Sequence, residues 1–262
     1  MVTANSAADT AKGKSGLHDP YIWHKLHSLS GILPIGIFLV QHLIANSYAL
    51  RGPSAYNTVI AVYGYLPFVA VLEIGIIYVP ILYHAIYGFY ISAYGVPNSQ
   101  AYVRNWMYTL QRISGVIAFF YIGFHIWNTS IQKYIQEWQG ASNPEQVIQY
   151  AAISHQMANP LMFTAYVIGI TATVFHFSNG IWNFCIRWGL TISAQSQRIT
   201  AFVCAGIFIV LTGIGIWTAA SLRVAGKSAG TPSARAIGHH VPMRFGSASV
   251  RLNIISAIER AG

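Results

Sequence analysis

The sequence predicts an all-α integral membrane protein, a bundle of five membrane-spanning helices. Composition is the first reason, because 54% of the 262 residues are hydrophobic and only 8% are charged, whereas soluble domains carry about 25% charged residues. Five stretches each supply the roughly 20 apolar residues that a span needs. Tryptophans and tyrosines lie near several ends of these stretches, as they do at membrane interfaces.

The expected spans are joined by polar connections, among them a loop at 51–66 that is rich in Gly, Pro and Asn and a longer loop at 134–159. The spans cover residues 26–48, 67–93, 110–131, 160–186 and 199–222. Pro34 and Pro80 lie inside two of them, which membrane bundles tolerate. We therefore divide the chain into a polar cytoplasmic lead (1–24), a five-helix membrane domain (25–222) and a basic tail (223–262). The tail is rich in Gly, Ser and Ala and is expected to be disordered.

The distribution of charge predicts how the chain is oriented in the membrane, and the net charge does not indicate nucleic-acid binding. The formal net charge of +9 comes from loops and the tail, and no motif for nucleic-acid binding accompanies it. With the N-terminus in the cytoplasm, the outer loops hold only Arg51 and Lys133. The inner segments then hold Lys12, Lys14, Lys25, Arg104, Arg112, Arg187 and Arg198. We expect this N-in orientation, although the basic tail argues against it, because distant charges count less.

A helix pair of about 65 residues appears twice in the sequence. The segment LHSLSG (26–31) leads to His42, and LQRISG (110–115) leads to His125. The glycine-to-histidine spacing is eleven residues (31 to 42) in the first copy and ten (115 to 125) in the second. The second helix of each pair carries His-x-x-x-Gly, at His84 and at His176. Four consecutive spans thus each carry one histidine deep inside the helix, and an ionisable residue inside a span indicates function.

The depths of these histidines predict two pairs. A helix rises about 1.5 Å per residue, so His42 lies about 24 Å and His125 about 22 Å from the inner face. His84 and His176 lie a similar distance from the outer face, because their helices run in the opposite direction. His42 and His125 therefore share an outer level, and His84 and His176 share an inner level about 15–18 Å away.

Two facing imidazoles suit the axial positions of a haem iron. Zinc needs four ligands and di-iron bundles need carboxylates, whereas Glu73 is the only acid clearly inside a span. We expect non-covalent haem, because the two cysteines form no C-x-x-C-H motif. Two axial histidines leave no open position and favour electron transfer. Glycines at four helix positions admit a macrocycle or a neighbouring helix: Gly31, Gly88, Gly115 and Gly180.

The inner haem also needs donors for its propionates near the membrane face. Four residues at the inner helix ends are candidates: His27, Ser28, Arg112 and Arg187. The two arginines equally suit a plain interfacial role. Ser30 and Ser114 precede the repeated glycines and either bond within their helices or support a haem edge.

The segments HSLSG, FLVQH, PILYHAIYG, RNWMYTLQRISG and FHFSNGIW resemble the cytochrome b subunit of succinate:quinone oxidoreductase, in its single-subunit, five-helix, two-haem form. The resemblance covers about residues 25–222. It implies that His84 and His176 bind a proximal haem b and that His42 and His125 bind a distal one. It also implies a flavoprotein subunit with FAD and an iron–sulfur subunit on the cytoplasmic side of the cell (inner) membrane.

The resemblance further implies electron transfer between succinate, oxidised on the partner, and a membrane quinone, usually menaquinone, near the distal haem. Polar residues at the outer level are candidate quinone donors: Asn46, Tyr48, Tyr56, Asn57, Asn128 and Glu73. Three alternatives stay open. The chain can instead be the cytochrome b anchor of a hydrogenase or formate dehydrogenase, a haem-free transporter with a histidine proton relay, or an anchor whose haems only stabilise assembly.

Overall fold

The computed structural model describes residues 20–65, 67–94 and 103–229, and within these ranges the chain is helical and contains no strand. The expected all-α fold is confirmed. The chain divides after Ala229 into two units, and only the first, Met1–Ala229, contains described residues. The expected polar lead therefore falls outside the described residues up to position 19, and the tail does so from 230 onward.

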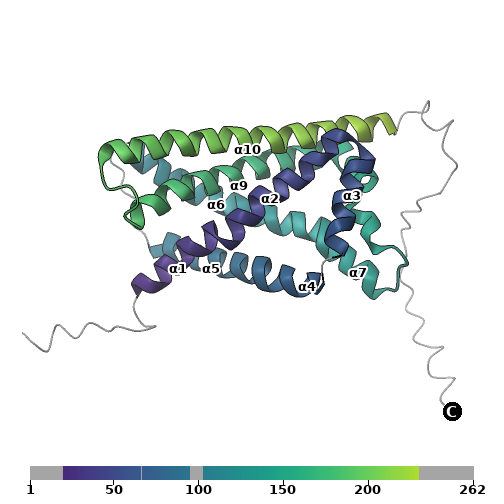
Figure 1. Cartoon of the computed structure of the whole chain (residues 1–262), viewed down its shortest axis with the longest axis horizontal. Coiled ribbons are helices and arrows are strands. Elements are labelled where there is room, and N and C mark those ends of the chain that lie inside the picture. Colours follow the sequence, from purple (N-terminus) through teal and green to yellow (C-terminus); the bar gives the residue numbers. More distant parts are fainter. Residues whose placement is uncertain (1–19, 66, 95–102, 230–262) are drawn as a thin grey trace, which may run out of the picture. The chain divides into compact units, whose positions relative to one another are not determined.

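The helices follow one another in the order shown in Figure 1. Short helical turns separate the long helices: η1 (Tyr48–Arg51), η2 (Glu73–Tyr78), η3 (Trp127–Ile131) and η4 (Pro144–Ile148). The α-helices are α1 (Pro20–Ile32), α2 (Pro34–Ser47), α3 (Pro53–Gly64), α4 (Val69–Leu72), α5 (Val79–Tyr94), α6 (Val103–Ile126), α7 (Gln132–Trp138), α8 (Tyr150–Ala158), α9 (Pro160–Arg187) and α10 (Ala194–Ala229).

Four stretches among the described residues are long and apolar enough to cross a membrane. They are Tyr21–Arg51, Val69–Tyr94, Pro160–Arg187 and Ala194–Ala229. The third expected span, 110–131, is not among these four, because Gln111, Arg112 and Asn128 lower its mean hydropathy. It forms most of α6, which is 24 residues long and continues into η3. That this helix also spans the membrane remains a prediction.

Prolines explain where the spans are irregular. Pro34 lacks a backbone N–H, so α1 ends at Ile32 and α2 begins at Pro34, with a single turn residue between them. The peptide nitrogen of Leu33 still donates to the carbonyl of Leu29 over 2.9 Å, so the two helices remain joined. Pro80 follows η2, a π-helical turn, and such turns absorb the hydrogen bond that a proline removes.

Two expected loops are helical in the structure. The first of these loops contains α3, which begins with Pro53 at its first position and buries Tyr56. The segment 134–159 contains α7, η4 and α8. Both are short helices that side-chain packing holds in place, which a search for long apolar runs does not detect. Helix α10 also continues beyond the expected end at Leu222, to Ala229.

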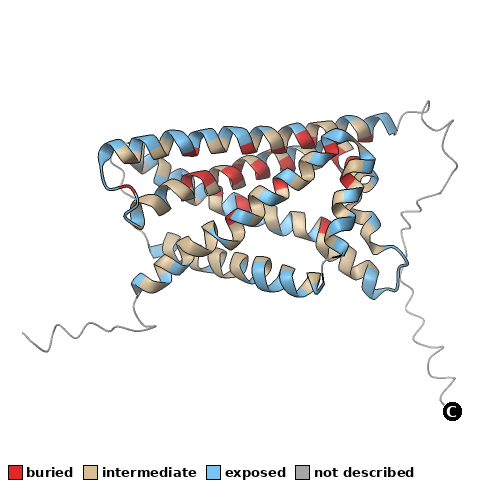
Figure 2. Cartoon of the chain, viewed as in Figure 1, coloured by how far each residue is buried: buried red, intermediate tan, exposed pale blue. Residues whose placement is uncertain are grey.

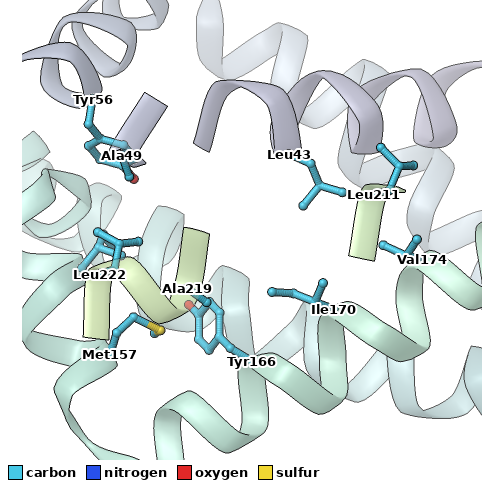
Figure 3. Packing of buried hydrophobic residues seen from close by; sticks show 11 residues of the cluster. Leu43, Ala49, Tyr56, Met157, Tyr166, Ile170, Val174, Leu211, Ala219 and Leu222 are labelled. Atoms are coloured by element: carbon cyan, nitrogen blue, oxygen red, sulfur yellow. The ribbon is translucent and has the colours of Figure 1, made fainter. Parts of the chain in front are cut away.

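The buried core lies where α2, α8, α9 and α10 meet (Figure 2). Val174 of α9 and Met157 of α8 are almost completely buried, at 0% and 1% exposed. Figure 3 shows side chains from these helices and from α3 converging on one cluster. In contrast, α5 has no buried residue. Helix α5 packs against α1 and α6, and α9 packs against α6 and α10, so the four histidine-bearing helices are neighbours.

Candidate haem-binding site

The structure brings the inner histidines together as one pair. His84 of α5 and His176 of α9 have ring centroids 6.0 Å apart, with the rings almost perpendicular at 89°. Both side chains are partly buried. The two residues are 92 positions apart in sequence (84 to 176), so only the folded bundle unites them.

The ring of His84 is held from α1. Its Nδ1 lies 2.9 Å from the carbonyl oxygen of His27 and 3.2 Å from the hydroxyl of Ser30. The ring also lies directly over Gly31, where an added Cβ would come within 2.6 Å of the His84 Cε1. A side chain at position 31 would therefore displace the imidazole. The repeated segment LHSLSG thus forms the contact site of this ring. We call this site, made of the His27 carbonyl, the Ser30 hydroxyl and Gly31, a histidine seat.

The ring of His176 is held from α6 in the same way. Its Nδ1 lies 2.9 Å from the carbonyl oxygen of Gln111 and 3.5 Å from the hydroxyl of Ser114. A Cβ added at Gly115 would lie 2.8 Å from the His176 Cε1. Carbonyl, serine and glycine occupy corresponding positions of LHSLSG and LQRISG. The repeat in the sequence is therefore a repeat of the histidine seat.

These contacts fix which nitrogen of each inner ring is available to a metal. A carbonyl oxygen only accepts hydrogen bonds, so Nδ1 of His84 and of His176 carries the proton. The Nε2 lone pair is then available for a metal. Donation of the second ring N–H to a carbonyl is the usual arrangement of a metal-ligating histidine, because it fixes the tautomer and the ring orientation.

The outer histidines form a second pair. His42 of α2 and His125 of α6 have ring centroids 5.7 Å apart, at an interplanar angle of 77°. Nδ1 of His125 lies 3.0 Å from the hydroxyl of Tyr166. Tyr121 stacks on the same ring, with ring centroids 6.0 Å apart, and the ring centroids of Phe38 and His42 are 5.2 Å apart. Among the described residues, the His42 ring has no hydrogen-bond partner.

Both pairs fit the axial ligands of haem. Metal–imidazole bonds are about 2.0–2.1 Å long, so rings on opposite sides of one iron have centroids about 6–6.5 Å apart. The observed 6.0 and 5.7 Å are close to that value. Nowhere in the described part of the chain do three or more His, Cys, Asp or Glu side chains converge so that they could hold a metal ion. The donor sets therefore match a metal that needs two protein ligands better than zinc or di-iron.

One of the predicted propionate partners, His27, lies beside the inner pair. His27 stacks on His84, with centroids 4.0 Å apart and the rings 16° from parallel, and its Nδ1 is buried without a hydrogen-bond partner among the described residues. The indole N–H of Trp188 donates to the hydroxyl of Ser28 over 3.1 Å. This contact places Ser28 next to the end of α9, where Arg187 is exposed.

Arg112 is engaged within its own helix. Its guanidinium lies 4.2 Å from the centre of the Tyr108 ring and donates to the hydroxyl of that residue. Arg112 directly follows Gln111, whose carbonyl holds His176, so it lies at the inner level. Of the four predicted partners, His27 contacts a ring of the inner pair, and binding of a propionate by any of the four stays a prediction.

Most of the predicted quinone donors are already bonded within the protein. Asn46 and Asn128 donate to backbone carbonyls one turn earlier, and Asn57 accepts the peptide N–H of Tyr150. The hydroxyl of Tyr134 donates to Glu73 over 2.5 Å. The Tyr56 hydroxyl lies 3.4 Å from the side-chain oxygen of Asn46. Tyr48 lines a groove along α2.

Sequence reasoning missed three residues that support the rings. Tyr166 bonds to His125, but a tyrosine in an apolar run carries no signal of that role. Gln111 donates from its side chain to the carbonyl of His176, and Asn179 donates to the Gln111 side-chain oxygen over 2.7 Å. The sequence held a clue to this pair. Gln111 lies four residues before Gly115, and Asn179 lies three residues after His176, so each amide shares a helix face with a residue of the repeat.

Comparison with known proteins identifies the family of the chain. The family described as "Succinate dehydrogenase/Fumarate reductase transmembrane subunit" matches residues 95–215. The succinate dehydrogenase cytochrome b558 subunit of Bacillus subtilis (strain 168) is 38% identical over 198 residues, which is 75% of this chain and 94% of the relative. The resemblance noted from the histidine motifs is confirmed. The chain belongs to the family of cytochrome b membrane subunits of succinate dehydrogenase and fumarate reductase.

Proposed function

We propose that this chain is the di-haem membrane anchor through which succinate dehydrogenase or fumarate reductase exchanges electrons with a membrane quinone. The observation that carries the proposal is the pair of equivalent seats at the inner level. In both, Nδ1 donates to a carbonyl and Nε2 is left for iron. A haem-free proton relay needs no such matched orientation of two rings.

The ligands follow from the pairing of the rings. His84 and His176 hold the inner haem b, and His42 and His125 hold the outer one. His27, Ser28, Arg112 and Arg187 are the proposed partners of the inner propionates. When bound between these histidines, haem would supply transfer of single electrons.

The net reaction of the complex balances without a further reactant. Succinate and quinone give fumarate and quinol, because succinate loses two electrons and two protons and the quinone gains the same number. The dicarboxylate site, FAD and iron–sulfur clusters belong to the flavoprotein and iron–sulfur partner subunits. This chain contributes the haem ligands, the quinone site and the membrane attachment. Fumarate reduction is the same reaction in reverse.

The proposed location is the cell (inner) membrane, with the N-terminus in the cytoplasm. This orientation places the inner histidine pair on the side of the iron–sulfur partner. The similarity to a succinate dehydrogenase subunit supports this function over the anchor of a hydrogenase or formate dehydrogenase.

Reduction of the haems by succinate tests the proposal. The complex is purified with its partner subunits, its haem is quantified, and a reduced-minus-oxidised spectrum is recorded after succinate and after hydrogen or formate. We expect about two haems per chain and reduction by succinate alone. One haem per chain, or reduction only by hydrogen or formate, contradicts the proposal. A flat spectrum supports the haem-free transporter.

A further inference from the structure

The two histidine seats differ at one position of the repeat. The segments LHSLSG and LQRISG align so that His27 of α1 corresponds to Gln111 of α6. Each of these residues supplies the carbonyl that holds a ligand ring. The side chain of His27 stacks on the ring of His84, whereas the side chain of Gln111 donates to the backbone of α9. The two ligands of the proposed inner haem are therefore held in different ways.

Gln111 and His176 are joined by two hydrogen bonds that run in opposite directions. The ring Nδ1 of His176 donates to the Gln111 carbonyl over 2.9 Å, and the Gln111 side-chain amide donates to the His176 carbonyl over 3.0 Å. A single hydrogen bond leaves the two helices free to turn about it. Two bonds between the same two residues close a cycle, which fixes both the separation and the rotation of α6 and α9 at this level.

Asn179 fixes the direction of the Gln111 amide. The Asn179 side chain donates to the Gln111 side-chain oxygen over 2.7 Å, and to the carbonyl of Met107, one turn earlier on α6, over 3.3 Å. A side-chain amide has one accepting end and one donating end, so this contact turns the donating end of Gln111 toward His176. Asn179 is only 7% exposed, and a buried amide without partners is costly. We call the bonds among Gln111, Asn179 and His176 the amide clasp.

The first copy of the repeat has no equivalent of the amide clasp. Tyr87 of α5 occupies the position that corresponds to Asn179, three residues after the ligand histidine. The hydroxyl of Tyr87 lies 2.9 Å from Nδ1 of His24. Nδ1 of His27 is buried without a hydrogen-bond partner among the described residues. The clasp therefore distinguishes His176 from His84, although both rings donate to a carbonyl over the same distance.

We propose that Gln111 and Asn179 are positioning residues for His176, which hold its ring perpendicular to that of His84 and thereby set the redox potential of the inner haem. This inference rests on the function proposed above. The clasp maintains the interplanar angle of 89° and the Nδ1 hydrogen bond of 2.9 Å. That hydrogen bond raises the basicity of the imidazole and stabilises the oxidised metal. Loss of the clasp should therefore turn the ring and raise the inner potential.

Variants of the complete complex test the clasp without a large change in side-chain shape. Gln111→Met and Asn179→Leu each replace an amide by an apolar side chain of similar size. If a single variant fails to assemble, the double variant takes its place, because it leaves neither amide unpaired. Asn183→Leu is the matched control, because its amide lies one turn farther along α9 and donates to the Asn179 carbonyl within the same helix. Haem content shows that each variant is folded and loaded.

The first readout is a redox titration of both haems. At an ambient potential near the inner midpoint of the wild type, the ratio of reduced to oxidised inner haem should rise about fivefold in Gln111→Met and in Asn179→Leu, as the weakening of one hydrogen bond predicts. The ratio for the outer haem, and both ratios in Asn183→Leu, should change less than twofold. An unchanged inner potential in the clasp variants, or an equal shift in the control, overturns the proposal.

The second readout is the EPR spectrum of the oxidised complex. The low-spin signal of a haem with two axial imidazoles depends on the angle between the ring planes, so a turned His176 ring shifts the inner signal and leaves the outer signal in place. An inner signal identical to that of the wild type in the clasp variants contradicts a positioning role. Failure of succinate to reduce the wild-type haems contradicts the proposed function instead, whereas the comparison of spectra still tests the clasp.

Discussion

His84 and His176 differ from His42 and His125 in what their second ring nitrogens contact. Each inner ring donates to a backbone carbonyl 2.9 Å away and rests on a glycine. In the outer pair, His125 contacts the hydroxyl of Tyr166, and His42 has no hydrogen-bond partner among the described residues. Backbone therefore orients the inner rings, whereas aromatic packing orients the outer rings.

This difference has an electronic consequence. A carbonyl that accepts the Nδ1 hydrogen raises the basicity of the imidazole and stabilises the oxidised metal. A neutral tyrosine hydroxyl is a weaker acceptor than a carbonyl, and an absent partner contributes nothing. The two haems are expected to have different potentials for this reason, even though all four ligands are histidines.

Removing an inner ligand gives the largest expected effect. His84→Ala or His176→Ala should abolish binding of the inner haem and leave the outer haem at least partly bound, because the pairs share no ligand. Haem quantification and a redox titration of the purified complex measure this outcome. His155→Ala, which alters an exposed histidine of α8, is the control and should retain both haems. Loss of the outer haem instead would refute the pairing.

Filling an inner seat should have a smaller effect. A methyl group at Gly31 or Gly115 would lie 2.6 or 2.8 Å from a ligand ring, so Gly31→Ala and Gly115→Ala should tilt that ring. We expect partial loss of the inner haem and a lower thermal stability of the loaded complex. Gly123→Ala is the matched control on α6, because nothing lies within 4 Å of its added Cβ. Equal haem loss in all three variants would rule out a specific seat.

The smallest effect is expected at the outer pair. Tyr166→Phe removes the hydroxyl that contacts His125. The outer potential should rise by a few tens of mV, because a hydrogen bond worth about 1 kcal/mol corresponds to about 40 mV for one electron. The inner potential should stay constant. Tyr121→Phe, which keeps the ring stacked on His125, is the control. A shift of both potentials in Tyr166→Phe would indicate a general structural change.

Periodicity and depth predicted more of the site than of the surrounding fold. The fixed rise of a helix was sufficient to place His42 level with His125 and His84 level with His176, and the structure places the same rings together. The short helices α3 and α8 were not predicted. They depend on burial of Tyr56 and Met157 against other helices, which local sequence does not reveal.

The supports of the rings were partly predictable. The serine and the glycine of each repeat were recognised from the sequence. For the serine, a bond within its helix and support of a haem edge both remained open. For the glycine, close approach of a macrocycle and of a neighbouring helix both remained open. Only the packing of α5 on α1 and of α9 on α6 shows that the glycine admits the ring. The contact between Tyr166 and His125 also joins two helices, so no spacing within one helix could indicate it.

The duplicated helix pair has a consequence for biogenesis. The first copy supplies His42 and His84, and the second supplies His125 and His176, so each proposed iron is shared between the two copies. Neither half of the polypeptide holds a complete coordination set. Complete coordination of either proposed haem is therefore expected only once both copies are in the membrane, where the bound cofactor would join the early and late halves.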